Sequence, residues 1–169
     1  EKGHDKFHTP GRIYRIIHEE EAPGKMPSMI GKEPKELLKY LGHPNGWWRN
    51  TAQKLIVFKN DQSIVPDLVD VIRNDDNPLK RLHALWTLEG LDAADRETVK
   101  MAFSDKDYRV RAASIRISDR YPDLTNSLKD IAADTSIEVL QQLILTARRH
   151  NEETKDWVKT IADRYPDNE

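Results

Sequence analysis

Aromatic and basic side chains gather at two places where their types and spacing would suit binding. The first follows a turn rich in glycine, proline and asparagine, and consists of Trp47, Trp48 and Arg49. The second is the pair His83 and Trp86, which are three residues apart and therefore on one side of a helix. Aromatic rings beside a guanidinium form a surface for a sugar or for a loop of a partner protein. These five residues are the candidate interaction surface.

Each of these residues also has a simpler structural interpretation. One of the two tryptophans would pack in the core while the other covers the first pair of helices. His83 shares its helix face with Trp86 and Glu89, which together have the residue types of a ligand set. A histidine satisfied at a junction between helices is the more frequent arrangement, so no metal is expected there.

Other residues of chemical interest form no catalytic or metal-binding set. His4 and His8 have a four-residue spacing, but the segment around them is not patterned as a helix. A basic stripe on one helix lies close to several aspartates, which predicts a solvated, internally paired face; its members are Arg109, Arg111, Arg116 and Arg120. No nucleophile turn and no glycine-rich phosphate loop is present. The sequence therefore predicts no enzyme, no metal and no cofactor.

The composition indicates a globular chain without cysteine chemistry. The 169 residues are 37% hydrophobic and 33% charged, with a net charge of −2 and no cysteine. Disulfides, thiolate ligands and covalent haem are thereby excluded. Binding to duplex nucleic acid usually needs a basic excess, which this chain lacks, so no nucleic-acid partner is expected. No apolar run approaches the roughly 18 residues that a membrane span needs.

The first 31 residues differ in pattern from the rest of the chain. Their prolines and glycines are spaced too closely for a helix. Residues 12–17, with the sequence Arg-Ile-Tyr-Arg-Ile-Ile, have the β-branched and aromatic character of a strand. Because one strand cannot satisfy its own backbone, it needs partners from outside this chain. We expect residues 1–31 to be a non-helical strand and linker, the tail of a preceding propeller, and residues 32–169 to be a helical domain.

From Pro34 onward the apolar residues follow the period of a helix. About nine helices joined by short turns are expected, over residues 35–41, 47–59, 64–72, 79–91, 96–103, 108–120, 124–132, 137–147 and 157–165. Residues 134–136, Asp-Thr-Ser, are expected to cap the eighth of these helices.

Turn-to-helix junctions recur along this helical region. They are Trp48-Arg49, Leu82-His83, Val110-Arg111 and Val139-Leu140, at spacings of 34, 28 and 29 residues. Residues 105–113, Asp-Lys-Asp-Tyr-Arg-Val-Arg-Ala-Ala, resemble the signature of HEAT repeats. In that signature a turn aspartate caps the helix and pairs with an arginine of an adjacent repeat, a contact that Leu140 cannot make. The predicted fold is all-α: a HEAT-like α-solenoid of about four two-helix repeats after a short non-helical N-terminal segment.

Three segments carry a more particular resemblance, residues 11–16, 42–53 and 82–91. They look like the closing strand of a sugar-dehydrogenase-type propeller and the HEAT segment that follows it in large bacterial putative membrane-bound or secreted dehydrogenases. In those proteins a c-type cytochrome domain comes next, but no Cys-x-x-Cys-His haem motif is present here. The resemblance implies a periplasmic or secreted location, although the sequence also allows the cytoplasm. It implies a propeller, a cytochrome domain or a separate protein as partner.

Two functions remain compatible with these sequence features. The first is a non-catalytic protein-interaction and spacer module within a larger dehydrogenase-like protein. The alternative is a HEAT-fold DNA glycosylase, in which Trp48, Trp86 and Arg81 would line a groove that holds a damaged base. The net charge of −2 argues against the second function.

Overall fold

The computed structural model describes Glu20, residues 28–149 and residues 154–165. Within these ranges the chain is helical throughout and contains no β-strand, which confirms the predicted all-α class. The strand expected over residues 12–17 and the pair His4 and His8 lie outside the described residues, so these predictions stay untested.

Nine α-helices occur among the described residues: α1 (Pro34–Leu37), α2 (Gly46–Lys59), α3 (Val65–Asn74), α4 (Pro78–Gly90), α5 (Arg96–Ala102), α6 (Tyr108–Ile117), α7 (Thr125–Leu128), α8 (Ile137–Ala147) and α9 (Lys155–Arg164). Short 3-10 segments extend or connect them: η2 (Leu38–Gly42), η3 (Gln62–Ile64), η4 (Ser118–Arg120), η5 (Pro122–Leu124) and η6 (Lys129–Ala133). None of the helices in the described ranges has both the length and the apolarity needed to cross a lipid bilayer.

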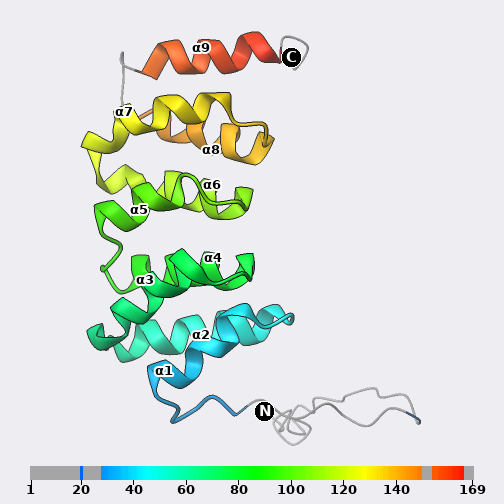
Figure 1. Cartoon of the computed structure of the whole chain (residues 1–169), viewed down its shortest axis with the longest axis vertical. Coiled ribbons are helices and arrows are strands. Elements are labelled where there is room, and N and C mark those ends of the chain that lie inside the picture. Colours follow the sequence, from blue (N-terminus) through cyan, green and yellow to red (C-terminus); the bar gives the residue numbers. More distant parts are fainter. Residues whose placement is uncertain (1–19, 21–27, 150–153, 166–169) are drawn as a thin grey trace, which may run out of the picture.

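The helices lie across the long axis of the molecule and are stacked along it in chain order, from α1 to α9 (Figure 1). Helices α2, α4, α6 and α8 each contact the next one and form what we call the main row. Helices α1, α3 and α5 contact the main-row helix that follows them, as η6 contacts α8. Helix α9 packs on η6 and α8 at the end of the stack. A single cluster of buried apolar side chains runs from Met29 to Ile161.

Side-chain caps define where the main-row helices begin. Asn45, Asn77 and Asp107 each accept the backbone N–H two residues along, which satisfies a donor that the first helical turn leaves free. The fourth helix differs from the expected pattern, because the hydroxyl of Ser136 makes no capping bond. There Asp134 accepts the N–H of Ser136 instead, and so orders the turn.

Two helices outside the main row, α1 and α7, are shorter than the sequence predicted. The single helix expected over residues 124–132 is divided into η5, α7 and η6. Thr125, Asn126 and Ser127 lie at its centre, and such side chains compete with the backbone for hydrogen bonds. The hydroxyl of Thr125 donates to the carbonyl of Pro122, which is this kind of competition.

Candidate interaction surface

A turn of the same construction precedes every helix of the main row. Its first side chain accepts the backbone N–H of the residue two positions along, as in an Asx turn. These first residues are His43, Asp75, Asp105 and Asp134, with donor–acceptor distances of 3.1, 3.0, 2.8 and 2.8 Å. They lie 32, 30 and 29 residues apart, which is the period of the structural unit.

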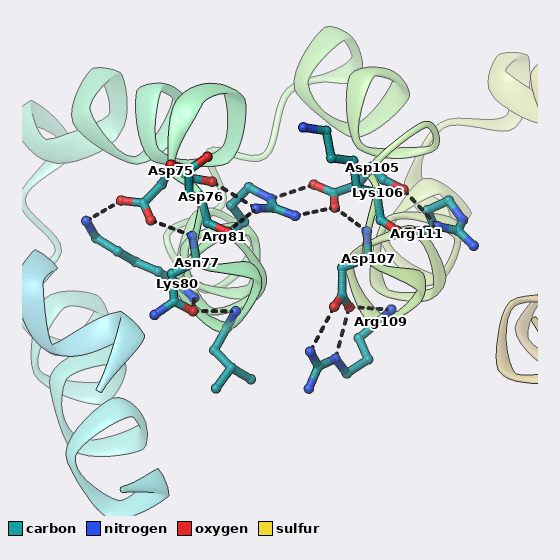
Figure 2. Close-up of polar contacts among 11 residues, drawn as sticks. Asp75, Asp76, Asn77, Lys80, Arg81, Asp105, Lys106, Asp107, Arg109 and Arg111 are labelled. Atoms are coloured by element: carbon teal, nitrogen blue, oxygen red, sulfur yellow. Dashed lines mark hydrogen bonds and ion pairs between the residues drawn. The ribbon is translucent and has the colours of Figure 1, made fainter. Parts of the chain in front are cut away.

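Arg81, which lies six residues after the first residue of its turn, connects two successive units. Its Nη1 donates to the carbonyls of Asp75 and Asp76 in its own turn, at 2.8 and 3.1 Å. Its Nε and Nη2 donate to both carboxylate oxygens of Asp105 in the next turn, at 2.8 and 2.7 Å (Figure 2). The Arg81 and Asp105 side chains are only 9% and 8% exposed, so this is a desolvated bidentate ion pair. The hydrogen bonds from Arg81 to Asp105 raise the pKa of the guanidinium.

Arg111 repeats this arrangement one unit further along. Its Nη1 donates to the carbonyls of Asp105 and Lys106, at 2.8 and 3.2 Å. Its Nε and Nη2 donate to Asp134 at 2.8 and 3.0 Å. Burial alone would raise the pKa of Asp134, but the hydrogen bonds from Arg111 and from the N–H of Ser136 lower it. At these two places the predicted pairing of a turn aspartate with an arginine of the adjacent unit is confirmed.

The first unit uses a histidine where the others use an aspartate. The Nη1 atom of Arg49 donates to the carbonyls of His43 and Pro44, at 2.6 and 2.8 Å, as in the other units. Its Nε, however, donates to Nε2 of His83 at 3.1 Å. The Nδ1 atom of His83 lies 2.7 Å from Oε1 of Gln53. Because an amide oxygen only accepts, Nδ1 carries the proton and Nε2 accepts from Arg49. Burial, and then the charge of Arg49, lower the pKa of His83.

These contacts correct the register of the second junction. The sequence pattern placed Leu82-His83 at the position of Val110-Arg111, but Lys80-Arg81 occupies it, six residues after Asp75. The constant interval of six residues between turn residue and arginine is the signal that would have found this register. His83 is instead the partner of the first arginine.

In the last unit, Leu140 stands at the arginine position and is buried in the core. Another helix donates to the carbonyl of Asp134 in this turn, since Arg164 of α9 binds it at 3.1 Å and binds the carbonyl of Ala132, before the turn, at 2.8 Å. Leu140 makes no such contact, and Arg164 of α9 donates to this part of the chain instead.

The two adjacent tryptophans have different surroundings. Trp48 stacks on His43 with ring centroids 4.6 Å apart and an angle of 15° between the planes, and it also contacts Tyr40 at 5.3 Å. Trp47 meets Trp48 edge-on and keeps 56% of its surface exposed. Trp48 therefore follows the structural interpretation, while Trp47 stays available to a partner.

A groove of about 680 Å³ lies between α2 and α4. Phe58, which is 88% exposed, and Trp86, which is partly buried, contribute its aromatic surface. The two helices approach closely at Gly90, because a Cβ atom there would lie 2.8 Å from Cγ2 of Val57. The groove is thus an exposed aromatic site between two helices that meet closely where the Val57 side chain packs on Gly90.

The structure places the five predicted site residues on two adjoining helices, α2 and α4. Arg49 and His83 are hydrogen-bonded to each other, and Trp48 packs against its neighbours. These three residues stabilise the contact between two successive units, and we call such a contact between an arginine and the next unit a joint. Trp47 and Trp86 contribute to the outer surface. Sequence reasoning missed Phe58, whose spacing of eleven residues from Trp47 places both on one side of α2.

The geometry also bears on a metal site and on the groove-lining role expected for Arg81 in a DNA glycosylase. Among the described residues, no three histidine, aspartate or glutamate side chains lie together as metal ligands. Arg81 lines a pocket of about 450 Å³ between its own turn and the next one, but its guanidinium is already bound to Asp105 and to two carbonyls. No family of known proteins, no curated protein and no solved structure matches this chain.

Proposed function

We propose that this chain is a non-catalytic scaffold, a HEAT-like solenoid of about four two-helix units, which binds a partner protein and acts as a spacer. The recurring turn supports the repeat. Its hydrogen bonds return at intervals of 32, 30 and 29 residues. Ties that join only successive units are typical of solenoids, whose stability is approximately a sum of unit and nearest-neighbour terms.

The Arg81–Asp105 and Arg111–Asp134 pairs support the spacer role. Each pair fixes two hydrogen bonds between successive turns, and the same arginine also holds its own turn. A planar guanidinium bound at three atoms leaves little freedom for one unit to rotate against the next. The stack would therefore hold bound neighbours at a constant separation.

The exposure of Phe58 in the α2–α4 groove is the observation that carries the binding role. An aromatic ring that is 88% exposed adds nothing to the core of its own chain. Large aromatic side chains at the edge of a pocket are the usual anchors of protein interfaces. Trp86 in the same groove and Trp47 on the same helix as Phe58 extend the surface that a partner would cover.

The resemblance to large bacterial dehydrogenase-like proteins supports a more specific context. In that context the partner is a propeller or cytochrome domain, in the same chain or a separate one, and the location is periplasmic or secreted. The glycosylase alternative has lost support, because Arg81 makes its ion pair inside the stack.

Photo-crosslinking in the source cells tests the binding role. A photoreactive phenylalanine analogue at position 58 is expected to give one discrete crosslinked protein, identified by mass spectrometry. The exposed Asp70 on α3 is the matched control position, because α3 lies outside the main row. The Phe58→Ser variant, which should fold normally, is expected to lose the partner in co-purification.

Crosslinking from position 70 but not from position 58 would contradict the proposal. So would a partner that Phe58→Ser retains with unchanged affinity.

A further inference from the structure

A second groove, at the other end of the stack, has a different character from the α2–α4 groove. It lies between α8 and α9 and has a volume of about 630 Å³. Its apolar surface comes from Ile144 and Ala147 on α8 and from Val158 and Ala162 on α9. Two helices thus form the walls, and the apolar residues on each wall are spaced by one helical turn, as for a third helix that packs between them.

The packing of α8 and α9 explains why this groove is open. The inner side of α8 contacts α6, the previous helix of the main row. On α9 the buried residues Trp157 and Ile161 belong to the side that contacts η6. Ile144 and Val158 are only partly buried, and Ala162 is exposed. Among the described helices, α6, η6 and α9 are packed against other sides of α8 and α9 and leave these apolar positions uncovered.

The charged residues that line the groove all carry the same sign. They are Arg148 at the end of α8 and Lys155 and Lys159 on α9, and none of the described residues that line the groove is acidic. Neither Arg148 nor Lys159 forms an ion pair with a described residue. In the α2–α4 groove, by contrast, Lys54 and Glu89 provide one charge of each sign. Only the α8–α9 groove therefore selects a partner by charge.

We propose that the α8–α9 groove binds an amphipathic helix of a partner protein whose apolar stripe is bordered by aspartate or glutamate. The apolar stripe covers Ile144, Ala147, Val158 and Ala162, and the acidic borders pair with Arg148 and Lys159. A second copy of this chain fits poorly, because a two-fold contact between the two grooves would bring the basic residues of one copy against those of the other. A lipid surface also fits poorly, because the apolar atoms form the floor of a groove, and membrane-binding helices present theirs on a protruding face.

Two synthetic helical peptides test this inference independently of the α2–α4 groove. Both are about 18 residues long with leucine at every third or fourth position, and they differ in having glutamate or lysine beside the leucines. Fluorescence anisotropy with the whole chain is expected to show saturable binding of the glutamate peptide, on the order of tenfold tighter than that of the lysine peptide. The difference should shrink as salt is added.

Charge-reversal variants provide the control. R148E/K159E is expected to abolish or invert the preference for the glutamate peptide. R73E/K100E makes the same change of charge at exposed positions of α3 and α5 and should leave the preference intact. Circular dichroism checks that each variant folds. Phe58→Ser should have no effect, so failure here and failure of the α2–α4 proposal are separable.

Three outcomes would overturn the inference. The first is equal binding of the two peptides, or binding that R148E/K159E leaves unchanged. The second is a concentration-dependent dimer in analytical ultracentrifugation that R148E/K159E abolishes, which would assign the groove to a second copy. The third is co-sedimentation with phosphatidylserine vesicles that R148E/K159E abolishes, with no binding of either peptide.

Discussion

The first joint of the stack and the two central joints each contain an arginine at the equivalent position of the unit, but these arginines have different partners. In the central joints the guanidinium is paired with a carboxylate, and in the first joint it donates to a neutral imidazole. The turn carbonyls are held identically in all three, through Nη1 of Arg49, Arg81 and Arg111. The arginine is therefore needed by its own turn, while its partner in the next unit can change.

This difference separates two contributions of one side chain. A desolvated ion pair is costly to break, since removal of one partner leaves a buried charge. A hydrogen bond from a guanidinium to a neutral imidazole leaves no such charge when it is lost. The central joints should consequently be the more sensitive to substitution, and the first joint the more sensitive to pH.

Of all the substitutions considered, Arg81→Met should cause the largest loss of stability. It removes both bonds to Asp105 and both to the carbonyls of Asp75 and Asp76, and it leaves the Asp105 carboxylate buried without its partner. We expect the free energy of unfolding to fall by about 3–5 kcal/mol. Urea denaturation followed by circular dichroism measures it. Arg73→Met, at an exposed position on α3, is the control and should change stability by less than about 0.5 kcal/mol. Equal effects of the two substitutions would refute the importance of the ion pair.

Arg111→Met should have a smaller effect than Arg81→Met. The Arg111 and Asp134 side chains are 18% and 10% exposed, so water can partly replace the lost partner. Asp105 and Asp134 each keep a bond from a backbone N–H of their own turn, so the difference between the two substitutions comes from burial. A loss of about 1.5–3 kcal/mol is expected in the same denaturation experiment. A loss as large as that of Arg81→Met would show that the contribution of each ion pair to stability does not depend on how deeply it is buried.

Gly42→Ala tests whether close packing, in addition to Arg49, stabilises the first joint. A Cβ atom at this position would lie 2.7 Å from Nδ2 of Asn77 and 3.0 Å from Cβ of Lys80. The carbonyl of Gly42 also accepts a hydrogen bond from Asn77, so the crowded atom is held in place. We expect a loss of about 1–2 kcal/mol in thermal or urea unfolding. Gly46→Ala, where only the end of the flexible Arg49 side chain is near, should be close to neutral; comparable losses would argue against close packing.

The smallest expected change in stability is the one caused by pH at the first joint. The pKa of His83 is lower in the folded chain than its ordinary value of 6.5. The unfolded chain therefore takes up the proton more readily, so stability is complete above about pH 6.5 and is lost as the pH falls toward the folded pKa. His83→Gln, which keeps an acceptor for Arg49, should lose less stability than the wild type between pH 7 and pH 5. Parallel stability curves would exclude a role for His83.

Much of the helical pattern was predictable because local signals determine it. Residues that cap helices, such as Asn77 and Asp107, and the apolar period of each segment place the main-row helices to within a few residues of their observed bounds. The helix predicted over residues 124–132 was divided, because Thr125 to Ser127 favour local hydrogen bonds over a continuous helix. The strand expected near Tyr14 lies outside the described residues and stays a prediction.

The candidate surface was only partly predictable. The sequence brought Trp47, Trp48, Arg49, His83 and Trp86 together as one set, and they do lie on adjoining helices. Their division into a joint and an exposed face depends on packing between α2 and α4, which no local pattern encodes. Phe58 was missed for the same reason, since an exposed and a buried phenylalanine look alike in a sequence.

By itself, the sequence determined the all-α class and the recurring turns that contain aspartates and arginines, because these depend on residue types at short, regular spacings. The tertiary structure alone decided which partner each arginine takes, that Arg164 replaces the arginine missing at Leu140, and where the two grooves open. These features depend on contacts between residues about 30 positions apart, and their geometry exists only once the helices are stacked.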